Sequence, residues 1–458
     1  MSTAHSITRR AADALRADVT GRVFLPGDLG YDQARQAWML TVNQRPAMVV
    51  EAASTADVAA AVRFARSYGL RIAPQGTGHG AAPLEPLESA LLLRTSRLRG
   101  VRIDPDTRTV RAAAGALWQD VAVPASDHGL AGLAGTSRDV GVTGYTLGGG
   151  IGWLARRYGL AANSVTAAEL VTPTGQLVHA DLEHEPDLFW ALCGGGGSVG
   201  VVTALEILLY PVTELYAGVL FFPVQRAADV LNSWREWTTS VPDEVTSIGR
   251  IVRIPPLPTV PNQLRGRAFA LVEAAYVGEK GAGADLIAPL RKLGPEIDTF
   301  ATIPASALSQ LHMDPTEPVA AVGDGTLLTD FPAAAADALV GLAGADADTM
   351  LISIEVRHLD GALRRPEADG SALPSIDASY ALYGSGVAAA SEAVATVAEH
   401  AQAVKAALAP WHANYSFYNL ADTPAPAQAL LPPEAYQRLK QIKTSCDPDD
   451  AIISAHPV

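Results

Sequence analysis

The chain has 458 residues, of which 48% are apolar and 18% are charged. This composition is typical of a large globular protein, and the length exceeds what one hydrophobic core usually organises, so we expect two domains. The formal net charge of −14 argues against nucleic acid and anionic membranes as partners, because both require a basic surface.

Neither the cysteines nor the histidines predict a disulfide scaffold or a metal site. Cys193 and Cys446 are too few for a disulfide framework. No metal-ligand spacing relates His128, His179, His184, His312, His400, His412 and His456. The first residues lack the apolar stretch of a secretory signal, and no run of about 20 apolar residues indicates a membrane span. We therefore expect a cytoplasmic protein without a bound metal.

The first clear elements are a strand, a helix and a second strand. The apolar run 48–50 forms the first strand. The helix begins after Ser54, which makes a start like a capping box, and ends at Gly69. The second strand, 70–73, leads into a loop with the sequence Pro-Gln-Gly-Thr-Gly-His-Gly, residues 74–80.

This loop has the properties of an anion-binding turn. Its three glycines tolerate positive φ and carry no side chain, so that backbone N–H groups can face an anion closely. His79 lies within the loop. A histidine in such a place indicates a contact with the ligand, although an incidental surface histidine would also fit.

Glycine is dense again at 131–160 and at 194–197. The surrounding segments predict strands at 90–93, 109–112, 168–171 and 176–178, helices within 113–130 and at 186–192, and a β-rich run at 199–210. Gly195 to Gly200 satisfies the pattern G-x-G-x-x-G of nicotinamide dinucleotide sites. That pattern requires a strand before it and a helix after it. Here the helix comes first and the strand second, so we reject a nicotinamide fold.

The pattern of predicted elements changes at about residue 211. Strands such as 216–222, 267–276 and 350–356 alternate with alanine-rich helices up to about residue 410. This pattern predicts a separate domain with an antiparallel sheet backed by helices. The tail, 411–458, has little core of its own and is expected to return to the first domain. The fold class is therefore α+β.

The strand within 350–358 carries a polar face. Alternation puts Ser353, Glu355 and Arg357 on one side and Ile352, Ile354 and Val356 on the other. A polar face on an interior strand requires solvent or a polar cavity. Glu355 is therefore a candidate catalytic base, and a simple Glu355–Arg357 salt bridge is an equally good explanation. Tyr380 and Tyr383 would point to opposite faces of a strand, so at most one of them lines a pocket; Tyr383 is a further catalytic candidate.

Three separated motifs together resemble one protein family. They are the histidine loop at 71–80, the segment 140–160 and the segment 189–203. They are similar to the covalent flavoproteins of the vanillyl-alcohol oxidase/p-cresol methylhydroxylase superfamily, in its berberine-bridge-enzyme-like branch. The resemblance implies a two-part FAD-binding domain of the PCMH type, comprising residues 1–210 and 411–458 with its core at about 42–212. A substrate domain, 211–410, lies between the two parts.

The resemblance also implies which residues contact the cofactor. His79 would be bonded covalently to FAD. Tyr145 would lie near the isoalloxazine ring, which makes it a candidate catalytic residue as well. The other expected contacts are Pro74, Gln75, Gly76, Thr77, Gly78, Gly80, Gly135, Thr136, Ser137, Val140, Gly141, Thr143, Gly144, Gly149, Gly152, Val201 and Asn419.

Three departures from the family pattern refine this expectation. Ser137 stands where doubly linked members carry a second flavin-bonding cysteine, so we expect a single covalent link. Val140 stands where a small residue goes with oxygen access, which favours an oxidase. In the tail motif, Phe-Tyr-Asn-Leu-Ala-Asp at residues 417–422, Leu420 replaces a tyrosine that serves as the base in some relatives, so that role cannot be transferred.

The function implied is that of an FAD-dependent oxidase. Hydride would pass from a small hydroxylated or amine-bearing secondary metabolite or carbohydrate to the flavin, and O₂ would reoxidise it to give hydrogen peroxide. Oxidative ring closure or oxygenation of a natural-product intermediate is one alternative. A flavin-binding protein without turnover is another. The expected partners are the small-molecule substrate and O₂, and the sequence leaves the oligomeric state open.

Overall fold

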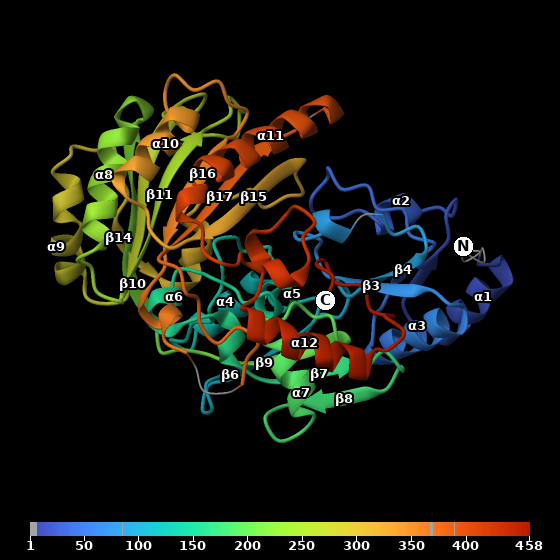
Figure 1. The fold of residues 1–458 in the computed structure, drawn as a ribbon. Helices are drawn as coiled ribbons and strands as arrows, with labels where there is room; N and C mark the ends of the chain where they lie inside the picture. Colours follow the sequence, from blue (N-terminus) through green and yellow to red (C-terminus); the bar gives the residue numbers. More distant parts are fainter. Residues whose placement is uncertain (1–6, 85, 367–369, 389) are drawn as a thin grey trace.

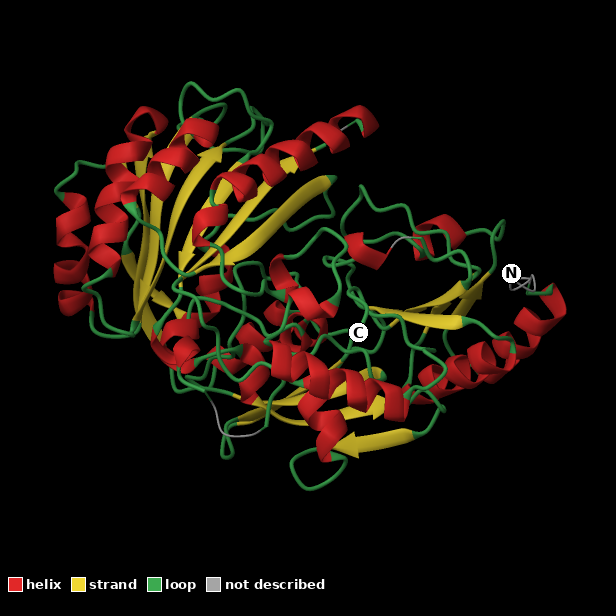
Figure 2. Ribbon diagram, in the orientation of Figure 1, coloured by secondary structure: helices red, strands yellow, loops and turns green. Residues whose placement is uncertain are grey.

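The computed structural model describes residues 7–84, 86–366, 370–388 and 390–458. These residues form three β-sheets with helices on their faces, so the expected α+β class is confirmed. The largest sheet and its helices occupy one end of the molecule, and the two smaller sheets occupy the other end (Figure 1, Figure 2). Within the described ranges, no helix combines the length and the apolar character that crossing a bilayer requires.

The four-stranded sheet carries the histidine loop. Its order is β1-β2-β4-β3, in which β2, β4 and β3 pair in parallel and β1 is antiparallel to β2. The predicted helix start is confirmed, because the Ser54 hydroxyl accepts a hydrogen bond from the Asp57 backbone N–H. The elements are α1 (Arg9–Asp18), β1 (Arg22–Phe24), α2 (Tyr31–Ala34), β2 (Met48–Glu51), α3 (Thr55–Ser67), β3 (Arg71–Gln75) and β4 (Ala90–Arg94).

The five-stranded sheet is antiparallel, with the order β5-β6-β9-β7-β8. A helix precedes the glycine run Gly195 to Gly200 and a strand follows it, which confirms that this run is not a nicotinamide fingerprint. The elements are β5 (Val101–Asp104), β6 (Thr109–Ala113), α4 (Trp118–Ser126), α5 (Val142–Leu147), α6 (Ala155–Tyr158), β7 (Val165–Val171), β8 (Leu177–Ala180), α7 (Pro186–Leu192) and β9 (Val201–Leu208).

The eight-stranded sheet is antiparallel, with the order β13-β10-β12-β11-β16-β17-β15 and with β14 also paired to β10. Helices cover one face, where Trp234, Phe331 and Leu339 contribute to a buried apolar cluster. The elements are β10 (Glu214–Pro223), α8 (Ala227–Thr238), β11 (Val245–Arg253), β12 (Ala268–Tyr276), α9 (Lys280–Arg291), β13 (Ile297–Asp298), β14 (Ala301–Pro304), β15 (Ala321–Leu328), α10 (Ala333–Ala343), β16 (Ser353–His358), β17 (Tyr380–Val387) and α11 (Ser391–Ala407).

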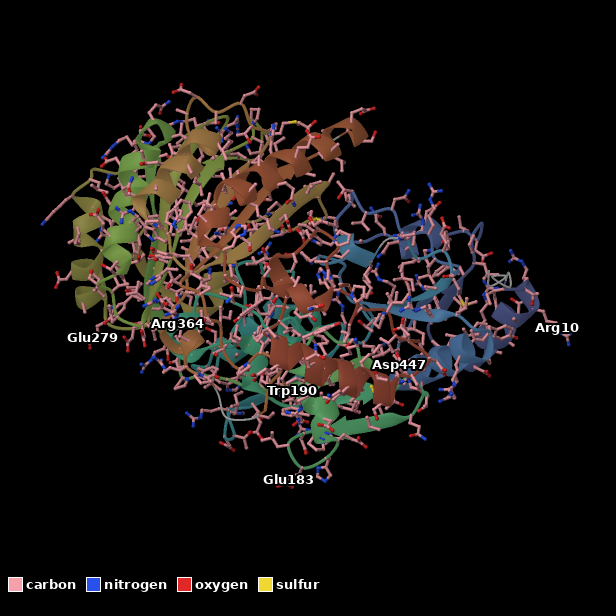
Figure 3. All side chains as sticks on the ribbon, viewed as in Figure 1. Arg10, Glu183, Trp190, Glu279, Arg364 and Asp447 are labelled. Atoms are coloured by element: carbon pink, nitrogen blue, oxygen red, sulfur yellow. The ribbon has the colours of Figure 1, made fainter. Side chains whose placement is uncertain are left out.

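The tail packs against the two smaller sheets. Its helix α12 (Pro433–Cys446) contacts α7, and the Arg438 guanidinium lies 4.3 Å from the centroid of the Trp190 ring. Trp190 and Asp447 are labelled beside this helix in Figure 3. Asp447 is buried, pairs with Lys443 and accepts hydrogen bonds from the backbone beyond α12, where Ile452 forms a bridge to β3. The tail is thereby fixed along the edge of the four-stranded sheet.

Candidate active site

A cavity of about 510 Å³ lies between the smaller sheets and the eight-stranded sheet. We call the glycine-rich segments 74–80 and 135–148 the floor, and the cavity-lining side chains of β11, β16 and β17 the roof. Residues 417–422 of the tail close one side. Most of the predicted cofactor contacts line this cavity: Pro74, Gln75, Gly76, Thr77, Gly78, His79, Gly80, Gly135, Thr136, Ser137, Val140, Gly141, Thr143, Gly144, Tyr145 and Asn419.

Three predicted cofactor contacts do not line the cavity. A Cβ on Gly149 would lie 2.7 Å from the Phe417 ring, and a Cβ on Gly152 would lie 1.8 Å from a backbone carbonyl oxygen. These glycines therefore allow close packing of the chain. Val201 belongs to the buried apolar cluster between α3 and the four-stranded sheet. The structure places all three in the packing behind the floor instead of on its surface.

His79 is held firmly within the floor. Its ring stacks on Trp38 with centroids 4.1 Å apart, and its Nδ1 lies 2.8 Å from the Thr77 hydroxyl. Its Nε2 is 3.7 Å from a carboxylate oxygen of Asp139, which accepts a hydrogen bond from the Trp38 indole at 2.6 Å. Burial lowers the pKa of His79 to about 4, so the imidazole is neutral at pH 7 and one nitrogen lone pair is available for bonding.

Several buried polar atoms around the cavity have no hydrogen-bond partner among the residues that the structure describes. They are both amide atoms of Gln75, Nε2 of His79, Oγ1 of Thr143 and the hydroxyls of Tyr145 and Tyr418. Unpaired buried polar atoms are costly, so a concentration of them indicates a polar ligand. FAD, which the sequence implies, has the ring nitrogens, carbonyl groups and diphosphate that such a set can bind.

The backbone of the floor requires glycine where the chain makes its closest contacts. Gly78 has a φ of +90°, and a Cβ there would lie 2.9 Å from Ala37. Gly150, just beyond the floor, has a φ of +76°, and a Cβ there would lie 2.5 Å from the Tyr145 ring. Loops with this freedom can direct backbone N–H groups at a diphosphate. The floor therefore fits FAD in its backbone as well as in its side chains.

Tyr145 is enclosed by the floor and the tail. Its ring meets Trp118 edge to face, with centroids 5.7 Å apart. Asn419 joins the tail to this region, because its Oδ1 accepts from the Gly150 N–H at 3.0 Å and its Nδ2 donates to the Tyr145 carbonyl at 3.3 Å. Burial raises the pKa of Tyr145, so its hydroxyl stays protonated and can donate to a ligand.

Ser137 connects the floor to the loop that precedes β15. Its hydroxyl and that of Thr136 both donate to one carboxylate oxygen of Asp314, at 2.5 and 3.0 Å. Among the described residues, no cysteine lines the cavity. The single covalent link expected from Ser137 stays a prediction.

The strand register places the polar side chains of the roof side by side. Arg250 of β11 is opposite Glu355 of β16, which is opposite Tyr383 of β17. Arg357 follows Glu355 on the same face. The cavity is lined by Ser353, Arg357 and Tyr383, whereas Glu355 is buried behind them. Ile352 also lines the cavity, which the alternation expected from the sequence did not predict. The reason is that Ile352 precedes β16, which begins at Ser353, so the regular alternation of the strand does not extend to it.

Tyr383 of the roof contacts a carboxylate of the tail. Its hydroxyl donates to Asp422 Oδ2 at 2.6 Å. Burial and the Asp324 charge raise the pKa of Asp422 to about 7, although the hydrogen bond from Tyr383 lowers it. Tyr380 is on the other face, where its hydroxyl lies 2.8 Å from that of Thr238. The prediction that at most one of the two tyrosines lines a pocket is confirmed.

Glu355 belongs to a buried charge cluster. Its Oε1 accepts hydrogen bonds from Nε and Nη2 of Arg357, at 3.0 and 2.7 Å, so the salt bridge weighed from sequence is present. Its Oε2 lies 2.8 Å from Nε2 of His312, and His312 also contacts Glu273. Burial alone would raise the pKa of Glu355, but Arg357 and His312 lower it. A carboxylate so strongly held is a poor base, and Glu355 is withdrawn as a catalytic candidate.

Sequence reasoning missed several residues that shape the site. Trp38 and Asp139 position His79, Asp422 holds Tyr383, and Asp314 joins the loop before β15 to the floor. His312 is a buried member of the cavity wall. Each contact joins segments remote in sequence or depends on a side-chain direction, so no local pattern marks it. Only Asp422, three residues after Asn419 in the tail motif, had a signal in the sequence.

Comparison with known proteins defines the class. Residues 46–181 match the family described as FAD binding domain. This segment is similar to FAD-binding domains, and the fold of the chain is that of berberine-bridge-enzyme-like structures, in agreement with the resemblance seen in the sequence.

Particular relatives can then be named. The chain is 31% identical over 230 residues to (R)-6-hydroxynicotine oxidase of Paenarthrobacter nicotinovorans, a match that covers 50% of each chain. BBE-like 1 of Physcomitrella patens has the same fold, with a TM-score of 0.85, 18% identity and coverage of 98% of both chains. 6-Hydroxy-D-nicotine oxidase of Arthrobacter nicotinovorans matches with a TM-score of 0.81, 23% identity and coverage of 95% and 96%. The chain spans about half the length of the curated relatives it matches.

Proposed function

We propose that the protein is an FAD-dependent oxidase acting on a small hydroxylated or amine-bearing organic molecule. The observation that carries this proposal is the neutral, buried imidazole of His79, which lines a cavity fitted to FAD and whose Nε2 lacks a hydrogen-bond partner among the described residues. The match to an FAD binding domain and the relatives named as oxidases support the same class.

The floor would hold the cofactor. Backbone N–H groups of the glycine loops would bind the diphosphate, and His79 would form the single covalent link. Bound FAD would accept the substrate hydride and transfer the electrons to O₂, giving hydrogen peroxide. Val140, which lines the cavity, supports oxygen access and thus the oxidase.

Removing a hydride from a C–OH or C–NH group also requires a proton acceptor. The phenolic oxygen of Tyr383 can accept the substrate proton while its own proton passes to Asp422 at 2.6 Å. With a pKa raised to about 7 by burial, the Asp422 carboxylate is basic enough to accept this proton at neutral pH. Tyr383 and Asp422 thus replace the tyrosine that Leu420 removes from the tail motif.

Two measurements test this function. Acid precipitation of the purified protein should leave a yellow chromophore in the pellet. Anaerobic mixing with a panel of alcohols and amines should bleach the flavin band, and in air each oxidised molecule should yield one hydrogen peroxide.

Other outcomes have distinct meanings. Colour released entirely into the supernatant would remove the covalent link. No bleaching by any compound would leave a flavin-binding protein without turnover. A product with a new ring or an added oxygen, shown by mass spectrometry, would indicate cyclisation or oxygenation instead.

A further inference from the structure

The roof places an arginine beside the proposed proton acceptor. Tyr383 is directly opposite Glu355 across β16 and β17, and Arg357 is two residues further along β16 on the same face. Arg357 is therefore a diagonal neighbour of Tyr383, and diagonal neighbours in an antiparallel pair have Cα atoms about 7 Å apart. A substrate of ordinary size can reach both side chains at once.

The guanidinium of Arg357 donates only part of its hydrogen bonds within the protein. Its Nε and Nη2 both donate to one oxygen of Glu355, and its Nη1 has no hydrogen-bond partner in the described part of the chain. The Arg357 side chain is 18% exposed, whereas that of Glu355 is 3% exposed. The cation thus lines the cavity while its counterion is behind it. Arginine in such a position is suited to carboxylates, because its planar fork of donors matches their two oxygens.

The charges behind the roof are paired. Arg250, His312 and Arg357 share the buried carboxylates of Glu273 and Glu355. A third carboxylate, that of Asp314, lies 3.8 Å from His312 and is held by the hydroxyls of the floor. Of the three cations Arg357 has the most exposed side chain, 18% against 8% for Arg250 and 4% for His312, so an incoming carboxylate meets Arg357 first.

One part of the wall near the roof is apolar, beside the polar Ser353, Ser385 and Asp314. This apolar part is lined by Met39, Pro315, Val319, Ile352 and Val387. A cationic amine would meet Arg357, which has the same sign, and a sugar would meet few hydroxyl partners on this wall. An organic acid with an apolar body complements both parts of the cavity.

We propose that the substrate is a carboxylic acid with an apolar body, whose carboxylate binds Arg357 and whose hydroxyl or amine lies at Tyr383. The placement at Tyr383 rests on the proposed function. The recognition of the carboxylate by Arg357 does not, and can be tested by binding alone. The position of Arg357 also sets the distance between the two groups, which must be a few bonds.

Titration calorimetry on the purified protein tests this recognition without turnover. The probes are two matched pairs that differ only in charge: mandelate against mandelamide, and 4-(hydroxymethyl)benzoate against 4-(hydroxymethyl)benzamide. At least one acid should bind at least ten times more tightly than its amide, as a charge-assisted contact provides. Equal binding within both pairs, or no measurable binding of either acid, overturns the proposal.

Two variants locate the recognition. In the double variant Glu355→Gln/Arg357→Gln no buried charge is left unpaired, and the preference for the acid should fall to within about twofold. In Glu355→Gln alone the Arg357 charge is uncompensated, so the acid should bind several times more tightly than to the native protein. A preference that persists in the double variant overturns the proposal. If neither variant folds, the acid–amide comparison on the native protein decides it. Failure to bleach flavin would overturn the proposed oxidase and leave this result standing.

Discussion

The two sides of the cavity are built in different ways. The floor is made of backbone: glycine loops that follow β3 and surround α5, with one histidine fixed between Trp38 and Thr77. The roof is made of side chains from three adjacent strands, β11, β16 and β17, together with Asp422 of the tail. A site built from backbone depends little on side-chain identity, whereas a site built from side chains can change with the substrate. We therefore expect the floor to determine the cofactor and the roof to determine the chemistry and the specificity.

The largest expected effect comes from replacing His79 in the floor. Replacing His79 by Ala should abolish the proposed covalent link completely, since His79 is the one anchor that the sequence implies and no cysteine lines the described cavity wall. The measurement is the colour of the acid-precipitated protein, or flavin fluorescence of the denatured band on a gel. His128→Ala, on the exposed surface, is the control and should retain the link. Retention in His79→Ala would assign the link to another residue.

The difference between floor and roof also explains what the sequence could reveal. The glycine loops, His79 and the helix that begins at Ser54 depend on residues close together in the chain, and their patterns are visible without a structure. The alternation that put Ser353 and Arg357 on one face is local as well, and it was correct for these two residues.

The sequence could not reveal the partners of those residues. The Tyr383–Asp422 contact joins residues 39 positions apart, and the Arg250–Glu355 neighbours are determined by strand register. The hydrogen-bonded residues Ser137 and Asp314 are separated by 177 positions. The sequence alone therefore does not decide between a catalytic base and a salt bridge on this polar face. The structure decides it, because Glu355 lies between Arg357 and His312.

The next largest effect is expected from Asp422, which holds Tyr383 in the roof. Asp422→Asn should lower kcat by about 100- to 1000-fold, with a smaller effect on KM, because the relay loses its final proton acceptor. In the native protein the rate should rise with pH through about 7, since the carboxylate form is the active one and its pKa is about 7. Steady-state peroxide formation against pH measures both, and the variant should lack this limb.

A matched pair of tyrosine variants controls for the position of the relay. Tyr383→Phe should lose activity to a similar degree as Asp422→Asn. Tyr380→Phe, on the opposite face of the same strand, should keep kcat and lose only about 1 kcal/mol of stability with its hydrogen bond to Thr238. Full activity in Tyr383→Phe would exclude the relay.

A smaller effect concerns the backbone next to the floor. Gly150→Ala introduces a side chain at a φ of +76°, 2.5 Å from the Tyr145 ring, and should cost about 2–3 kcal/mol of unfolding free energy. Gly341→Ala in α10 is the control, because a Cβ there meets no atom within 4 Å and alanine favours the helix by about 1 kcal/mol. Thermal denaturation should shift in opposite directions for the two variants, and equal shifts would contradict the steric argument.

The smallest effect should come from the charge cluster behind the roof. Burial and Arg250 alone would lower the pKa of His312, but Glu273, Asp314 and Glu355 together raise it to about 9. A raised folded-state pKa means that the protonated imidazole stabilises the fold. This stabilisation is fully present below the unfolded value of about 6.5 and is lost as the pH rises through about 9. The unfolding free energy should therefore fall by about 1–3 kcal/mol between pH 7 and pH 9. Asp422 adds a smaller fall of about 0.4 kcal/mol in this range, because with a folded pKa of about 7 it is still half protonated at pH 7. In His312→Gln the slope should flatten while the starting stability is lower, and an unchanged slope would show that His312 is neutral and that the roof carries less positive charge than its geometry implies.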